Sequence, residues 1–158
     1  MTASLFFATI NICNGPIIFM HYRGKYTPSF PAKYRGDVRD IVYRSSWEYK
    51  FMKWCDNTAS VSEWGSEEII IPYISPVDGK RHRYFPDFYV KVANKKYIVE
   101  VKPFKQTLEP KTQKRVTKRY INEVVTYSVN QAKWKAAREF CKDHSLEFML
   151  ITEKELKV

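Results

Sequence analysis

The chain has 158 residues and a net charge of +10, from 27 Lys and Arg against 17 Asp and Glu. That length suits one domain with a single core, and so positive a charge favours a polyanionic partner, nucleic acid ahead of a membrane surface. The three cysteines lie far apart without metal-ligand spacing. This pattern argues against structural zinc and any disulfide partner, and fits a reducing cytoplasm.

The first twenty residues contain no Lys, Arg, Asp or Glu, and a basic segment follows directly. The stretch lacks the positive region of a secretory signal, and Asn11 and Pro16 interrupt it too early for a transmembrane span. We therefore interpret residues 1–19 as a non-native or disordered extension. We expect a basic arm over residues 20–40 and a single domain over residues 41–158.

Apolar periodicity predicts two main helices. Aromatic and other apolar residues recur at helical spacing over residues 41–57 and predict the first. Asn130 is a suitable N-cap for the second, over residues 130–144. The pattern Thr152-x-x-Glu155 is a capping box that predicts a short terminal helix.

Runs of β-branched and aromatic residues predict strands, and residues 61–102 have the pattern of a strand meander. Pro72 indicates an edge strand or a bulge, and Pro76-Val77-Asp78-Gly79 is a turn signal. The strands expected are residues 69–74, 83–85, 87–92, 97–102 and, after the second helix, 146–151.

Two short segments carry the candidate chemistry, Pro86-Asp87 and Glu100-Val101-Lys102. Side chains alternate along a strand, so Glu100 and Lys102 share a face while the valines point away. Ions in so apolar a strand are costly unless they pair or bind metal. If the two strands pair, Asp87 approaches Glu100. The alternatives are an exposed Glu100–Lys102 ion pair and a turn function for Asp87.

These residues suit a magnesium site. Mg²⁺ takes hard oxygen ligands, typically one or two carboxylates with waters and substrate phosphate. Asp87 and Glu100 supply the carboxylates and the Val101 carbonyl could add a backbone oxygen, so we expect Mg²⁺, with Mn²⁺ as a substitute. Such a metal lowers the pKa of a bound water. Lys102 would orient that water or stabilise charge in the transition state.

Glu48 lies on the first predicted helix, beside its apolar stripe. It is a candidate fourth catalytic residue and a candidate metal ligand. The alternative is a capping function, because Ser45-x-x-Glu48 is a capping-box pattern that closes a helix N-terminus. We favour catalysis, and the sequence leaves both open.

Basic residues, many beside aromatic ones, are candidate DNA contacts. They are densest from Lys102 to Arg119, where seven Lys or Arg stand against one acid, a net of +6. A loop expected over residues 103–117 would clamp the DNA backbone, and the alternative is a merely solvated loop. The candidate contacts are Arg23, Lys25, Arg44, His82, Arg83, Lys105, Lys111, Lys114, Arg115, Lys118 and Arg119.

The pattern Pro86-Asp87 followed by Glu100-Val101-Lys102 resembles the motif of the PD-(D/E)xK nuclease superfamily. Longer segments, spread over roughly residues 20–156, resemble the head completion nucleases of T-even-type tailed phages. TnsA-type transposase endonucleases are more distantly similar. The segments are Tyr22–Tyr26, Ile41–Ser45, Trp47–Tyr49, Phe51-Met52, Trp54–Asp56, Ile71–Tyr73, Ser75–Asp78, His82–Tyr89, Val99–Pro103 and Asn130–Ala137.

The resemblance implies an α/β fold of the restriction-endonuclease type, with a mixed central sheet flanked by helices. It implies a DNA nuclease that completes a filled phage head before the tail joins, with Glu48, Asp87, Glu100 and Lys102 in its site. The implied partners are double-stranded DNA and phage portal, neck or head proteins. The implied location is the host cytoplasm during assembly, with association to the virion.

Gln131 and Lys133, in the second predicted helix, are expected as auxiliary phosphate contacts. Two other functions stay open. One is a non-catalytic, DNA-binding head or neck protein, and the other is a junction-resolving or repair endonuclease. A membrane-surface function is disfavoured, because the basic residues do not lie on one amphipathic helix.

Overall fold

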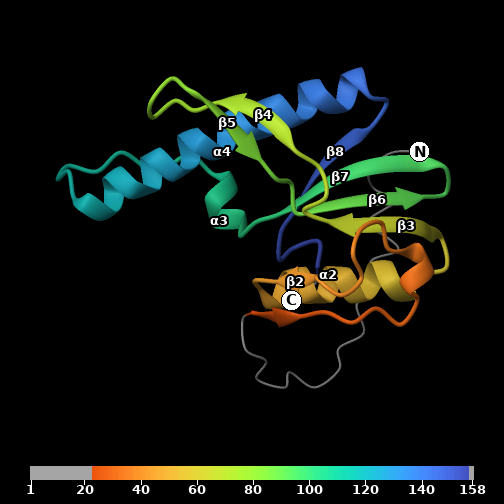
Figure 1. The fold of residues 1–158 in the computed structure, drawn as a ribbon. Helices are drawn as coiled ribbons and strands as arrows, with labels where there is room; N and C mark the ends of the chain where they lie inside the picture. Colours follow the sequence, from red (N-terminus) through yellow and green to blue (C-terminus); the bar gives the residue numbers. More distant parts are fainter. Residues whose placement is uncertain (1–22, 157–158) are drawn as a thin grey trace.

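A four-stranded mixed sheet forms the centre of the computed structural model, which describes residues 23–156 (Figure 1). The strand order is β3-β6-β7-β8. The first three strands are antiparallel neighbours, and β8 lies parallel to β7. The bounds are β3 Val61–Ser66, β6 Phe88–Val92, β7 Lys95–Val101 and β8 Glu147–Ile151. The expected mixed sheet is confirmed.

Two helices, α2 (Ser46–Asn57) and α4 (Lys118–Asp143), lie on opposite faces of this sheet (Figure 1). Successive side chains of β7 point to opposite faces of the sheet, which explains this arrangement. Val99 packs in the core cluster that contains the apolar residues of α2. Ile98 packs with Cys141 of α4 on the other face. The three layers confirm the predicted α/β class.

The segment before α2 packs onto the domain through its aromatic residues. It contains β1 (Gly24–Lys25), paired with β2 (Val42–Tyr43), and a short 3-10 helix, η1 (Pro31–Lys33). Tyr26 and Tyr34 belong to the main core. Their rings make edge contacts with Trp64, with centroids 5.9 and 4.7 Å away. Residues 23–40 of the predicted basic arm therefore include core residues.

A hairpin of β4 (Ile71–Ile74) and β5 (Arg81–Tyr84) separates β3 from β6 in the sequence and forms its own two-stranded sheet. It packs on α4 through Ile71, Tyr84 and Ala137 (Figure 1). The predicted meander over residues 61–102 is therefore wrong as a continuous sheet. Pairing of β3 with β6 leaves the hairpin outside, which strand propensity alone cannot reveal. The edge position of Pro72 is confirmed, since β4 pairs only with β5.

The first predicted helix begins later than expected, at Ser46 rather than near residue 41. Ser45 is extended and its side chain accepts a hydrogen bond from the Glu48 backbone N–H, which closes the helix N-terminus. Val42 and Tyr43 pair with β1 instead. The apolar spacing continues through both segments and therefore hides the boundary.

The second helix begins much earlier than predicted, at Lys118, with Thr117 as its N-cap. Asn130 is a buried residue in the middle of α4 and not a cap. The cause of the error is that the first turns of α4 are exposed, as at Ile121 and Val125, so core-facing periodicity starts only near residue 130. The predicted basic loop also contains a one-turn helix, α3 (Phe104–Thr107).

The last predicted strand is confirmed as β8, but the predicted terminal helix is a turn. The capping contacts do form, because the Thr152 backbone N–H and hydroxyl both donate to the Glu155 carboxylate, at 2.7 and 2.6 Å. Cys55 and Cys141 are both buried. Within residues 23–156, no helix is long and apolar enough to cross a membrane. Residues 1–19, the predicted extension, lie outside the described part.

Candidate active site

Strand register brings Asp87 and Glu100 together. Phe88 of β6 pairs with Val99 of β7. Asp87 precedes Phe88 and Glu100 follows Val99, so Asp87 and Glu100 face each other across the two strands. The Asp87 backbone N–H donates to Glu100 Oε2 at 3.4 Å. Asp87 Oδ2 accepts a hydrogen bond from the Val101 N–H at 2.8 Å. The approach of Asp87 to Glu100 that was expected if the two strands pair is therefore present.

Lys102, which follows β7 directly, completes the group. Its Nζ lies 3.1 Å from Glu100 Oε1, as expected for two residues on one strand face. Burial, and then the Glu100 carboxylate, raise the pKa of Asp87 well above its usual value, while Lys102 opposes the rise. Burial alone would lower the pKa of Lys102, but Glu100 and Asp87 outweigh it and raise that pKa. The Lys102 side chain therefore stays protonated and positively charged.

Tyr84 is a site residue that the sequence analysis missed. Its hydroxyl donates to Glu100 Oε2 at 2.6 Å, and the residue is only 3% exposed. Burial and then Glu100 raise the pKa of Tyr84, so it stays a donor. Lys133 Nζ of α4 lies 5.6 Å from the centre of its ring. The sequence signal was an aromatic residue in the strand before Pro86, but only the position of the hairpin brings it to Glu100.

Glu48 makes the capping contacts that were the alternative to catalysis. Its Oε2 accepts from the Arg44 backbone N–H at 2.8 Å, and its own N–H donates to Ser45 Oγ at 3.0 Å. The same carboxylate also raises the pKa values of Asp87 and Lys102 by its charge. Glu48 therefore caps α2 and borders the site at once.

A second acid, Glu67, also borders the site and was not predicted. It follows β3, and its backbone N–H donates to the Asp87 carbonyl at 3.1 Å. Its carboxylate forms a short ion pair with the guanidinium of Arg44. This hydrogen bond to Glu67 is the main reason that the pKa of Arg44 is raised, and the charges of Glu67, Glu48 and Asp87 add to it.

The donor set fits a hard divalent cation. Within residues 23–156, no three His, Cys, Asp or Glu side chains group as a complete metal cage. Mg²⁺ does not need one, because it commonly binds through one or two carboxylates and completes its shell with water and phosphate. Asp87 and Glu100 are such a pair.

The candidate DNA contacts lie on several elements. Arg23 and Lys25 are exposed at β1, and Lys25 lies 4.0 Å from Asp40. Arg83 and His82 are exposed on β5, where His82 Nε2 lies 2.9 Å from an Asp78 oxygen.

The remaining candidates lie around α4. Gln131 and Lys133 are partly buried in the middle of the helix, and Lys133 is the one that the structure brings to Tyr84. The others are exposed on α3, the following loop and the start of α4, a part that extends sideways beyond the sheet (Figure 1). They are Lys105, Lys111, Lys114, Arg115, Lys118 and Arg119.

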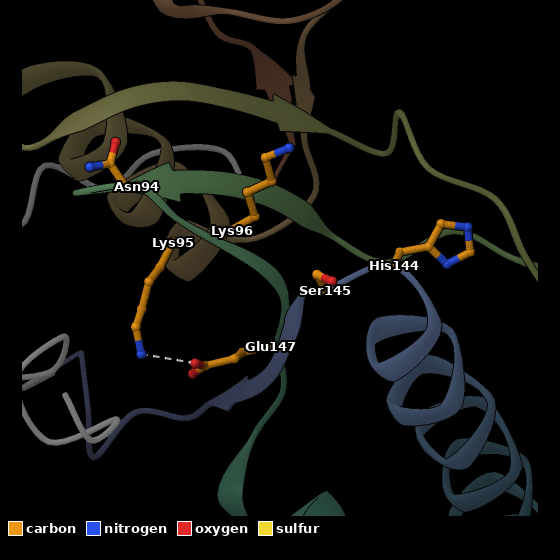
Figure 2. A pocket seen from close by; sticks show the side chains of 6 residues that line it. All are labelled: Asn94, Lys95, Lys96, His144, Ser145 and Glu147. Atoms are coloured by element: carbon orange, nitrogen blue, oxygen red, sulfur yellow. Dashed lines mark hydrogen bonds and ion pairs between the residues drawn. The ribbon is translucent and has the colours of Figure 1, made fainter.

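A surface hollow of about 450 Å³ lies at the opposite end of the sheet (Figure 2). It is lined by the first residues of β7 and β8 and the end of α4, and contains the Lys95–Glu147 ion pair, 3.1 Å long. Its lining offers one carboxylate and no facing pair, so it does not have the donor set described above.

The chain is similar in sequence to known nucleases. A family model described as TnsA-like endonuclease N terminal matches residues 58–153, a region that contains Asp87, Glu100 and Lys102 and leaves out Glu48. The chain is also similar to the head completion nuclease of Enterobacteria phage T4, with 40% identity over 143 residues, which is 87% of this chain and 95% of that relative. No solved structure matches.

Proposed function

The chain belongs to the TnsA-like endonuclease N-terminal family and to the family of the phage T4 head completion nuclease, and from this premise we propose that it is a metal-dependent DNA nuclease that acts in phage head completion. The observation that carries the proposal is the convergence of Asp87, Glu100 and Lys102. The substrate is double-stranded DNA, and the reaction is hydrolysis of a phosphodiester bond. The cofactor is Mg²⁺, with Mn²⁺ as a substitute.

The acidic and basic residues of the site have different functions in this proposal. Asp87 and Glu100 would hold the metal, with the Val101 carbonyl as a further oxygen ligand. The bound metal supplies a water of lowered pKa and neutralises charge on the phosphate. Lys102, which keeps its proton beside Glu100, orients the attacking water or stabilises the extra charge of the transition state. Glu48 is a further metal ligand or a capping residue that fixes the edge of the site.

The proposal is tested with purified protein, closed circular DNA, linear duplex and added Mg²⁺. We expect cleavage by the natural protein, none with EDTA, and none by Asp87→Ala. Asp37→Ala, which removes an exposed carboxylate outside the site, is the matched control and should cut normally. Nicking of the circle indicates endonuclease action, and shortening of the linear duplex alone indicates exonuclease action.

Two results would contradict the proposal, and each would favour a different function. If neither the natural protein nor Asp87→Ala cuts DNA, the protein is a structural head or neck component that binds DNA. If it cuts branched DNA much faster than duplex, it is a junction-resolving or repair endonuclease. As a head-completion enzyme it would work in the host cytoplasm during assembly, in contact with portal, neck or head proteins, and could remain with the virion.

A further inference from the structure

Arg44 lies between β2 and α2, at the edge of the proposed site, and acidic groups surround it. Its guanidinium pairs with the Glu67 carboxylate, and its backbone N–H donates to Glu48 Oε2 at 2.8 Å. The side chains of Arg44 and Glu67 are 51% and 37% exposed, so solvent reaches the pair. The pair therefore lies where an incoming DNA strand could contact it.

The partner, Glu67, is fixed directly beside Asp87. Ser66 of β3 pairs with Phe88 of β6, so Glu67 follows β3 at the level of Asp87, and its N–H donates to the Asp87 carbonyl at 3.1 Å. Glu67 has a φ of 55°, in the left-handed region that a residue with a side chain rarely adopts. Such conformations persist where surrounding contacts impose them and often occur at functional sites.

The edge of the site is strongly acidic, which is a problem for a DNA nuclease. Glu48 and Glu67 border Asp87, so a phosphate brought to Asp87 and Glu100 meets their negative charge as well. A cation beside Glu48 and Glu67, in addition to Lys102, would offset the repulsion between these carboxylates and the phosphates. Arg44 is suitable, because a guanidinium stays charged at any working pH and this one lies against Glu67, with its backbone N–H bonded to Glu48.

Carboxylates and phosphates are recognised by arginine in the same way. The planar guanidinium donates two parallel hydrogen bonds to either anion. An exposed ion pair is weak, so a phosphate can displace its carboxylate. We propose that Arg44 binds a DNA phosphate next to the scissile one, and that Glu67 occupies this phosphate site until DNA displaces it. This inference rests on the proposed function.

The test is binding of a short, fluorescently labelled duplex in EDTA, where cleavage does not interfere. Glu67→Gln removes the competing charge and should tighten the dissociation constant roughly fivefold. Arg44→Ala should weaken binding roughly tenfold and lower the salt slope of binding by about 1. In the double variant, Glu67→Gln should add nothing, because its effect acts through Arg44.

Glu147→Gln is the control for net charge. It removes the same negative charge, but at the far end of the sheet, in the Lys95–Glu147 pair (Figure 2). A gain with Glu67→Gln no larger than with Glu147→Gln overturns the proposal. So does a gain that persists without Arg44, since Glu67 would then act by general repulsion. Thermal unfolding of each variant checks that the fold is intact.

Cleavage of plasmid by the natural protein, measured in parallel, separates this inference from the proposed function. If the natural protein cuts DNA but Glu67→Gln leaves binding unchanged, the proposed phosphate site at Arg44 and Glu67 is wrong and the proposed nuclease function stands. In cleavage, Glu67→Gln should lower KM, because it removes a competitor for substrate binding.

Discussion

Three residues converge on the Glu100 carboxylate, which is only 3% exposed. Tyr84 and the Asp87 backbone N–H donate to one oxygen, and Lys102 contacts the other. A buried carboxylate is costly unless it is paired and hydrogen-bonded. These contacts meet that requirement and fix the direction of Glu100, so a metal ligand would be held in place before the metal arrives.

Substitution of Tyr84 by Phe should weaken metal binding and activity by about 10- to 100-fold, the usual effect of removing a hydrogen bond to a ligand. The ring stays, so the packing of the hairpin on α4 should survive. Calorimetric titration with Mn²⁺ measures the affinity directly. Tyr73→Phe, on the neighbouring strand β4, is the matched control. Unchanged affinity in Tyr84→Phe would mean that its hydroxyl does not position Glu100.

Substitution of Lys102 by Met should lower kcat about 100-fold or more, comparable to the loss of one donor to a developing charge. Metal affinity should not fall, because Glu100 loses a competing cation. Initial rates at saturating DNA and Mn²⁺ titration measure the two effects separately. A parallel loss of metal binding would assign Lys102 to the structure of the site instead.

Among the elements, α2 is tied to the segment before it by one buried acid. Asp56, at 0% exposure, accepts hydrogen bonds from the Tyr26 hydroxyl and from the backbone N–H groups of Ser29 and Phe30, at 3.0, 2.6 and 3.0 Å. Burial and then Asp56 raise the pKa of Tyr26, so its hydroxyl stays a donor. This contact attaches residues 23–40 to the domain.

Asp56→Ala should therefore lower the free energy of unfolding by about 3 kcal/mol, since it leaves several buried donors without their acceptor. Urea unfolding followed by tryptophan fluorescence measures the change. Asp37→Ala is the control in the same segment. Its carboxylate is exposed and bonded to nearby Arg39, so its removal should leave the free energy of unfolding nearly unchanged. Equal effects would show that Asp56 does not attach the segment.

At the scale of the whole molecule, more than half of the net charge of +10 falls in residues 102–119, at the end of β7 and beyond. Loop and helix residues after Lys102 carry much of the net charge of +10 and extend beyond the sheet (Figure 1). Each phosphate that such residues neutralise releases counterions, so binding weakens as salt rises. This part of the molecule would then hold the DNA backbone while the carboxylates act on it.

Replacing both Lys114 and Arg115 by Ala should lower the slope of log affinity against log salt by about 2. The kcat value should stay unchanged, because these exposed residues lie outside the catalytic group. Binding measured over a range of salt concentrations gives the slope. Lys91→Ala with Lys96→Ala, at the far end of the sheet, removes the same charge and should leave the slope unchanged. An equal effect of both pairs would mean that DNA has no defined path.

The proximity of Asp87, Glu100 and Lys102 could be predicted from the sequence because its geometry is local. The period of two places Glu100 and Lys102 on one face of a strand, and a hairpin of 12 intervening residues brings Asp87 opposite. Tyr84 and Glu67 could not be found in this way. Their partners depend on how a separate hairpin and the end of β3 lie against β6 and β7.

By itself, then, the sequence determined most strand positions and the approach of the two carboxylates to their lysine, since periodicity and turn residues act within a few residues of the chain. The α/β class and the family came from the resemblance of longer segments to known nucleases. Only the tertiary structure decided that the β4–β5 hairpin leaves the sheet, that α4 starts at Lys118, and that Glu48 caps α2 beside the site. These features depend on which surfaces become buried against each other. Burial is a property of the packed molecule, so no local pattern specifies it.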